Sequence, residues 1–167
     1  MTDPVRLVSP SGQLLLEQVG QSRGTAILAG DLHALRPLVA AHDWPTDDTL
    51  AGLGAALSQA HSDADTPFLV VGADTGEVIG DCGWKSGPGP DGRAEIGYGL
   101  APSVRGLGLG TEVVRTLTGW ALAEPGCSSV VAEVLADNLP SRRALEQGGF
   151  VIDRTDGPYV WYLCSEA

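Results

Sequence analysis

The sequence contains few cysteines, and they follow no recognisable spacing. Cys82, Cys127 and Cys164 are odd in number and form no C-x-x-C pair, which excludes a disulfide framework and argues against a cysteine-based zinc site. The 3 histidines also lack the spacing of metal ligands. We therefore expect no metal site and a reducing, cytoplasmic environment.

Long apolar runs and clusters of basic residues are missing as well. No segment approaches the ~20 apolar residues of a membrane-spanning helix, and Met1–Pro4 does not begin a signal peptide. The formal net charge is -11, from 10 Lys and Arg against 21 Asp and Glu. Binding to nucleic acid requires a basic face, so we expect neither nucleic-acid nor membrane partners. The acidic balance favours cationic ligands such as protonated amines, although solubility alone also accounts for it.

The remaining composition is that of one ordinary globular domain. The chain has 167 residues, of which 43% are hydrophobic and 19% are charged, and this is enough to bury a core. Its 23 Gly and 11 Pro residues are spread without a repeat period. This distribution predicts many turns between short elements.

The first part of the chain predicts a strand pair followed by two helices. Apolar runs at residues 5–8 and 14–19 indicate an N-terminal hairpin. Asp31 is a candidate cap for a helix that carries Leu32 and Leu35 and that Pro37 kinks. A second helix is expected to begin at Thr46 and to end near His61.

The rest of the chain alternates strands and helices. We expect strands at 68–71, 77–79, 94–100, 130–135, 150–152 and 159–163, with a loop at 86–92. One helix follows residue 110 and carries an apolar stripe of Val113, Leu117, Trp120 and Ala121. A short helix is opened by Pro140 and closed by Gly148. The order predicts one mixed α/β (α+β) domain without a linker.

A glycine-rich loop, Arg105-Gly106-Leu107-Gly108-Leu109-Gly110, stands between a predicted strand and a predicted helix. The first N–H groups of a helix have no partner within it, and the helix dipole adds partial positive charge there. Glycines let a phosphate approach these groups closely. The loop therefore predicts a pyrophosphate-binding site.

Two common nucleotide-binding motifs do not fit this loop. A dinucleotide fingerprint requires glycine at position 111, where Thr111 stands. An ATP-binding loop requires Gly-Lys-Ser/Thr, and the only lysine of the chain is Lys85, well upstream. Both motifs are excluded.

The loop resembles the cofactor motif Arg/Gln-x-x-Gly-x-Gly/Ala of the GCN5-related N-acetyltransferase (GNAT) superfamily, with Arg105, Gly108 and Gly110 at its three required positions. Glu95-Ile96-Gly97-Tyr98 and Asn138-Leu139-Pro140-Ser141 are similar to segments of the branch that acetylates the N-termini of ribosomal proteins (RimJ/RimL-like). The resemblance covers roughly residues 67–163. Residues 1–66 match only in their two-helix layout.

The resemblance implies a single N-acetyltransferase domain over residues 1–167. Residues 1–66 would supply an N-terminal strand and the substrate-side helices, and residues 67–163 the cofactor-binding core. The central sheet would be mixed, with the strands through Glu95–Leu100 and Val130–Leu135 splayed apart. Acetyl-coenzyme A (acetyl-CoA), the acetyl donor, would bind in the gap between them.

The resemblance also implies which residues contact this donor. The backbone near Leu100 and Ala101 would bind the pantetheine arm, Asn138 would hydrogen-bond the arm, and Ser141 would lie near the thioester sulfur. The pyrophosphate would be cradled by seven consecutive residues: Arg105, Gly106, Leu107, Gly108, Leu109, Gly110 and Thr111.

The implied chemistry is direct attack of a neutral amine on the thioester, which requires a base and an acid. Glu95 and Glu133 both qualify as the base by position, and Glu95 is preferred, although either is also compatible with a structural role. Many relatives place an acidic tyrosine where Leu145 stands here, which leaves Ser141 as the expected proton donor. Three tyrosines are reserve candidates: Tyr98, Tyr159 and Tyr162.

The sequence leaves the amine acceptor open between a protein N-terminus and a small molecule. A catalytically silent, regulatory module that binds acyl-CoA is the alternative function, because fold alone does not fix activity. Relatives often pair, so the resemblance also leaves a homodimer open.

Overall fold

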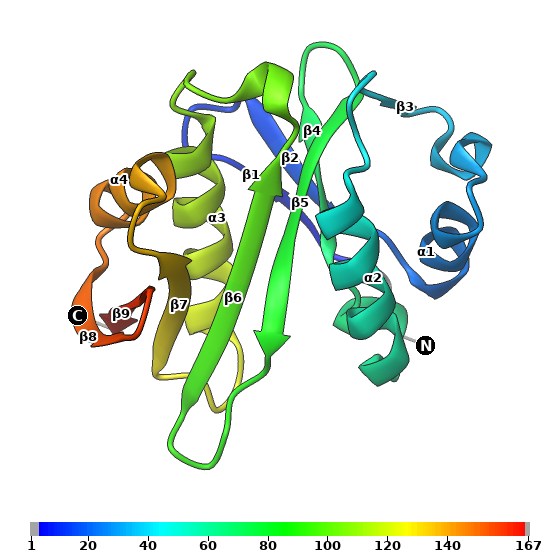
Figure 1. Cartoon of the computed structure of the whole chain (residues 1–167). Helices are drawn as coiled ribbons and strands as arrows, with labels where there is room; N and C mark the ends of the chain where they lie inside the picture. Colours follow the sequence, from blue (N-terminus) through cyan, green and yellow to red (C-terminus); the bar gives the residue numbers. More distant parts are fainter. Residues whose placement is uncertain (1–3, 166–167) are drawn as a thin grey trace.

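The computed structural model describes residues 4–165, which form one mixed sheet with helices on both faces (Figure 1). The strand order is β1-β2-β4-β5-β6-β7-β9-β8, and β3 pairs with β5. The strands are β1 (Arg6–Val8), β2 (Leu14–Gln18), β3 (Val39–Ala40), β4 (Phe68–Gly72), β5 (Glu77–Ser86), β6 (Arg93–Leu100), β7 (Ser129–Leu135), β8 (Val151–Asp156) and β9 (Tyr159–Ser165). The helices are α1 (Gln21–Leu28), α2 (Asp47–Gln59), α3 (Leu109–Ala123) and α4 (Leu139–Gln147), with 3₁₀ turns η1 (Leu32–Leu35), η2 (Asp63–Asp65) and η3 (Pro102–Val104).

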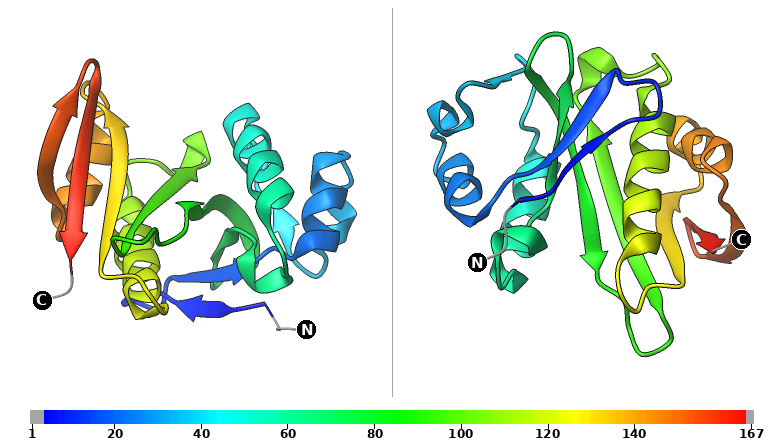
Figure 2. Two further views of the ribbon diagram at one scale, coloured as in Figure 1. Left: turned by 90° about the horizontal axis from the view of Figure 1, so that it is seen from below. Right: turned by 180° about the vertical axis from the view of Figure 1, so that it is seen from behind.

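The two faces of the sheet carry different helices. Figure 2 shows α1 and α2 on one face and α3 on the other, with α4 beside α3. The apolar stripe predicted on α3 is confirmed, because Val113, Leu117 and Ala121 are fully buried. Trp120 completes the stripe and packs edge-on against Phe68, with ring centroids 5.0 Å apart. Each large apolar side chain buried in this way contributes roughly 1.5–3 kcal/mol to folding.

The sheet opens between β6 and β7. The two strands are parallel and pair only where Arg93–Glu95 meets Ser129–Val131, although β6 continues to Leu100. Beyond this point β7 pairs only with β9, over its whole length. The predicted splaying of the central strands is confirmed, and it leaves backbone groups of β6 facing an open gap (Figure 1).

The N-terminal region differs from the prediction in two places: a 3₁₀ turn stands where the first helix was predicted, and helix α1 was not predicted. The β1–β2 hairpin is confirmed, and Asp31 does cap a turn by accepting a hydrogen bond from the N–H of His33 at 3.1 Å. That turn ends at Leu35, because the residue before Pro37 favours an extended backbone, and the chain then adds β3 to the sheet.

Helix α1 was missed because Gly24 lies in its middle and weakens the helical pattern. The glycine allows α1 and α2 to pack closely, since a Cβ at this position would lie 2.8 Å from a methyl carbon of Leu57 on α2, which would have to shift. Helix α2 itself begins as predicted, with Thr46 in a capping box with Thr49. At the other end of the chain, β8 runs longer than expected because its charged residues occupy an exposed edge strand.

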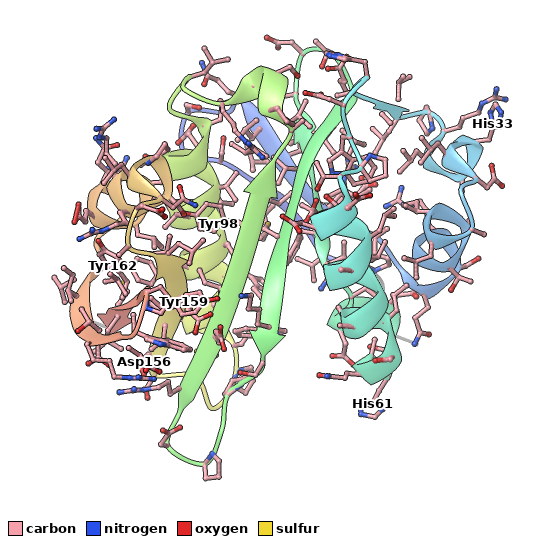
Figure 3. The ribbon with its side chains drawn as sticks, viewed as in Figure 1. His33, His61, Tyr98, Asp156, Tyr159 and Tyr162 are labelled. Atoms are coloured by element: carbon pink, nitrogen blue, oxygen red, sulfur yellow. The ribbon has the colours of Figure 1, made fainter. Side chains whose placement is uncertain are left out.

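Two further observations concern the part of the chain that the structure describes. None of its helices is long and apolar enough to cross a bilayer. None of its His, Cys, Asp and Glu side chains form a group of three or more that could hold a metal ion. His33 and His61 lie far apart on the surface (Figure 3).

Candidate functional site

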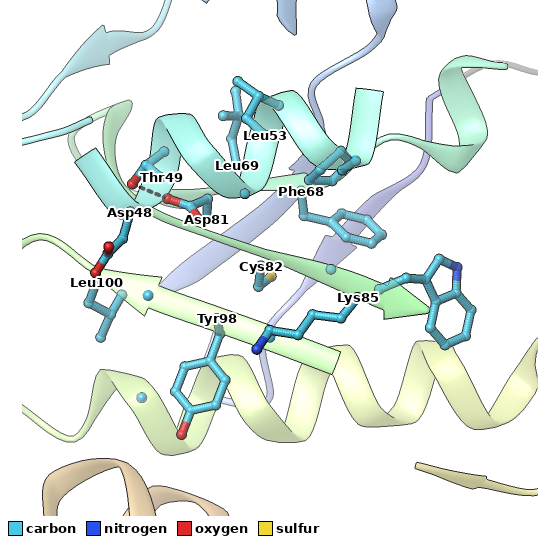
Figure 4. A pocket seen from close by; sticks show the side chains of 18 of the residues that line it. Asp48, Thr49, Leu53, Phe68, Leu69, Asp81, Cys82, Lys85, Tyr98 and Leu100 are labelled. Atoms are coloured by element: carbon cyan, nitrogen blue, oxygen red, sulfur yellow. Dashed lines mark hydrogen bonds between the residues drawn. The ribbon is translucent and has the colours of Figure 1, made fainter. Parts of the chain in front are cut away.

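A cleft of about 1360 Å³ lies over the opened sheet. Residues from α2 line one side, residues from β5 and β6 line the floor, and the first turns of α3 and α4 line the other side. Figure 4 shows part of this lining from close by, with Asp48 and Asp81 near the α2 side and Tyr98 on β6. The cleft therefore brings the glycine-rich loop, the Asn138 segment and α2 to one place.

The glycine-rich loop presents a row of unpaired N–H groups. Gly106 and Gly108 both have φ near 79°, a left-handed conformation that favours glycine, and Gly108 is the N-cap of α3. Within residues 4–165, the backbone N–H groups of Gly106–Thr111 have no hydrogen-bond acceptor. A Cβ at Gly106 or Gly108 would meet no atom within 4 Å, so the space next to the loop is open. This arrangement is typical of an anion site.

Arg105 and the end of β6 form the upper rim. The Nε of Arg105 donates to the carbonyl of Leu100 at 3.1 Å, and Arg105 also lines the cleft. Leu100 lies opposite Gly80, and the N–H of Ala101 donates to the carbonyl of Ile79 at 2.8 Å. Backbone direction alternates along a strand, so the N–H and carbonyl of Leu100 point away from β5, into the gap.

Ala101 differs from Leu100 in this respect. Its N–H is engaged by Ile79, and its carbonyl accepts from the N–H of Val104 at 3.1 Å. The N–H and carbonyl of Leu100 therefore face the gap, where the carbonyl already accepts from Arg105, while both groups of Ala101 are engaged by Ile79 and Val104.

The start of α4 forms the opposite rim. Asn138 is the N-cap of α4, and its side-chain oxygen accepts a hydrogen bond from the N–H of Ser141 at 3.3 Å. Gly110 of α3 lies against Ala144 of α4, where a Cβ at Gly110 would be 3.4 Å from the Cβ of Ala144. Asn138, Ser141 and Gly110 all line the cleft.

Tyr98 joins β6 to this rim. Its phenol oxygen lies 2.7 Å from the hydroxyl oxygen of Ser141 and donates to the Ser141 carbonyl at 3.2 Å. Burial raises the pKa of Tyr98 and outweighs the opposing effect of the Ser141 hydrogen bond, so the phenol keeps its proton at neutral pH. Sequence reasoning ranked Tyr98 only as a reserve candidate, because nothing local indicates that it meets Ser141.

The other positions considered for an acid do not reach the cleft. Leu145 is fully buried. The hydroxyl of Tyr162, also fully buried, donates to Glu146 at 3.1 Å and accepts from Arg142 at 3.0 Å. Tyr159 lies on β9, is 38% exposed and does not line the cleft. Tyr162 is therefore a structural residue.

Glu95 and Glu133 lie on the sheet face that α2 covers. Glu95 is opposite Val131, and Glu133 is two residues further along β7 on the same face. The Lys85 ammonium, which lines the cleft, is 3.9 Å from Glu95. Burial raises the pKa of Glu95, the Lys85 charge lowers it, and the Glu133 charge raises it, with a net increase. Glu95 therefore lies beside the Lys85 ammonium, but neither Glu95 nor Glu133 is among the residues that line the cleft.

Asp81 is a cleft residue that sequence reasoning missed. Its Oδ2 accepts hydrogen bonds from the indole N–H of Trp44 at 3.0 Å and from the hydroxyl of Thr49 at 2.8 Å (Figure 4). Burial raises the pKa of Asp81 more than these two hydrogen bonds lower it. The signal in the sequence was a single carboxylate within an otherwise uncharged strand segment, Val78–Trp84.

Comparisons with known proteins agree with this geometry. A family model described as the acetyltransferase (GNAT) domain matches residues 26–151. A protein of Bacillus subtilis (strain 168) named uncharacterized N-acetyltransferase YjdG is 32% identical over 96 residues, which are 58% of this chain and 57% of that protein. The chain thus spans little more than half the length of this relative.

Solved structures share the fold at lower identity. RimJ of Mycobacterium smegmatis, in complex with CoA-disulfide, has a TM-score of 0.62 at 22% identity, covering 98% of this chain and 90% of that one. AAC(6')-Ib, in complex with paromomycin and acetyl-CoA, has a TM-score of 0.63 at 22% identity, covering 92% of this chain and 93% of that one. At these identities the comparison establishes the fold alone.

Proposed function

Since the chain belongs to the acetyltransferase (GNAT) domain family, we propose that it transfers an acetyl group from acetyl-CoA to an amine. The observation that carries this proposal is the row of unpaired N–H groups at Gly106–Thr111, which opens onto the cleft beside the splayed strands. Hydrogen bonds to a charged group are each worth about 1.5–3 kcal/mol. Several such bonds suffice to hold the pyrophosphate of coenzyme A.

The residues present fit this donor. The pyrophosphate would bind the amides of Gly106–Thr111 beside Arg105, in the open space next to the two left-handed glycines. The pantetheine arm would run along the gap and pair with the backbone of Leu100 as a further strand would. Asn138 lines the same gap and has a side-chain amide group to offer the arm.

In the proposed reaction, the acceptor nitrogen forms a bond to the acetyl carbonyl carbon, and the thioester C–S bond breaks. Glu95 would take the proton of the attacking amine, with Glu133 as the second candidate. The raised pKa of Glu95 brings its basicity closer to that of a useful general base. The Tyr98–Ser141 pair would return a proton to the departing thiolate, since the phenol is protonated at neutral pH.

The test of this function combines donor binding with turnover. Calorimetric titration with acetyl-CoA should show binding, and a panel of small amines and N-terminal peptides should release free thiol. Binding without thiol release from any acceptor would favour the silent acyl-CoA-binding module. Absence of acetyl-CoA binding would overturn the whole proposal.

The acceptor class needs a separate measurement. Mass spectrometry of the reaction products distinguishes acetylated peptide N-termini from acetylated small amines. Intact-mass analysis of the protein must accompany it, because Lys85 lines the cleft and its own acetylation would also release thiol.

A further inference from the structure

Asp81 is a carboxylate in the cleft wall without a cationic partner. Both of its hydrogen bonds fall on Oδ2, and in the described chain its Oδ1 has no donor and the side chain forms no ion pair. Taking a carboxylate out of water without a compensating cation is unfavourable. A ligand that brings a cation to Oδ1 would supply the missing interaction.

The carboxylate is held in place for such a ligand. Trp44, which donates to it, is only 3% exposed. Thr49 is buried, and its hydroxyl oxygen also lies 3.0 Å from that of Thr46 in the capping box of α2. Both donors therefore belong to fixed parts of the fold, and the orientation of Asp81 is set before any ligand binds.

The floor beside Asp81 includes two glycines of β6, Gly99 and Gly97, and the Lys85 side chain crosses it at Gly97. Asp81 pairs with Gly99, where a Cβ would meet no atom within 4 Å. Two residues along β6, Gly97 is crossed only by the stem of Lys85, whose Cε would be 3.0 Å from a Cβ there. Gly99 adds no side chain to the floor beside Asp81, and a chain that runs on towards Glu95 passes the stem of Lys85.

The spacing along β6 shows that one ammonium group cannot pair with both Asp81 and Glu95. Gly99 marks the position of Asp81 on this strand, because the two residues are paired. Glu95 and Gly99 are four residues apart on the same face, which corresponds to about 13 Å of strand. A linear amine with roughly ten chain atoms has this reach. A short monoamine placed beside Glu95 would leave Asp81 unpaired.

We propose that Asp81 binds a second ammonium group of the acceptor, and that the acceptor is a linear polyamine whose reacting amine lies beside Glu95. This inference rests on the proposed function for the identity of the reacting end. Asp81 is then a specificity-determining residue, because it contacts the acceptor without touching the reacting atoms. The overall charge of -11 further favours a polycation over a neutral acceptor.

The test compares a long and a short amine on two variants. Spermidine is the long probe and butylamine the short one, at saturating acetyl-CoA. D81N should raise the KM for spermidine at least tenfold, while the KM for butylamine and for acetyl-CoA stays within twofold. Asp47 lies at the same end of α2 but does not line the cleft. D47N removes its charge and should leave the KM for both amines unchanged. Equal KM increases for both amines in D81N would overturn the assignment.

A binding measurement separates this inference from the proposed function. Spermidine is titrated calorimetrically into the wild-type protein and into D81N, each with coenzyme A present, so that no turnover is required. At least tenfold weaker binding to D81N supports the site even if no amine is acetylated, in which case only the proposed function fails. Equal spermidine affinity, or no binding to the wild-type protein, overturns the role of Asp81.

Discussion

The phenol oxygen of Tyr98 lies 2.7 Å from the hydroxyl oxygen of Ser141, and this contact links the middle of β6 to the first turn of α4. The two residues are 43 positions apart in the chain and come from opposite sides of the opening between β6 and β7. A protonated phenol is thereby placed at the gap, whereas Leu145 is buried in the core.

Replacing Tyr98 with phenylalanine should lower kcat by about 10²–10⁴-fold, the usual contribution of a general acid. The affinity for acetyl-CoA should change little, because the ring and its packing remain. Steady-state kinetics and calorimetry measure the two quantities. Y159F is the control, since Tyr159 lies on β9 outside the cleft. If S141A abolishes turnover while Y98F retains it, Ser141 is the donor.

Gly108 and Gly30 form a matched pair for testing the anion site. Both have positive φ, 79° and 87°, and a Cβ at either would meet no atom within 4 Å. Valine at either position should strain the backbone by roughly 1–2 kcal/mol. Only G108V should also lose most of its acetyl-CoA affinity, because only Gly108 lines the cleft. Calorimetry showing the same affinity for both variants would contradict the loop assignment.

The local features of the chain were predictable, because each depends on a few neighbouring residues. The start of α2 at Thr46 and the glycine-rich loop before α3 both carry their own signals. Contacts across the sheet were not predictable from one sequence. The Tyr98–Ser141 contact and the Trp44–Asp81 hydrogen bond each require knowing which distant segments fold together.

The pH dependence should reveal whether Glu95 is the base. Lys85, 3.9 Å away with its side chain 54% exposed, lowers the pKa of Glu95. Removing this charge in K85M should therefore raise the pKa, and the acid limb of kcat/KM should move to higher pH because the base must be ionised. Solvent screening keeps the expected shift modest.

K85R is the matched control, since it retains a cation and should retain the profile. E95Q should reduce kcat strongly while E133Q reduces it less. An unchanged acid limb in K85M, together with a larger loss in E133Q than in E95Q, would assign the base to Glu133.

Asparagine at Asp81 should make the protein more stable at neutral pH. Burial raises the pKa of Asp81 in the folded state above its ordinary value. Between the ordinary pKa and the raised pKa, the folded state therefore keeps a proton that the unfolded state has released. Stability is therefore lost as the pH rises through this range, and at pH 7 the full penalty of the ionised carboxylate is present. An asparagine oxygen can still accept from Trp44 and Thr49, without the charge.

The gain in Tm at pH 7 should be about 2–4 °C for each kcal/mol recovered in a chain of this size. The gain in Tm should shrink as the pH falls towards the ordinary pKa of an aspartate. There the wild-type carboxyl is protonated and, like asparagine, carries no charge. Thermal unfolding of wild type, D81N and D47N across this pH range measures the effect. A lower Tm for D81N at pH 7 would mean that the hydrogen bonds from Trp44 and Thr49 to a charged acceptor outweigh its burial, and Asp81 would then be a structural residue that stabilises the N-terminus of α2.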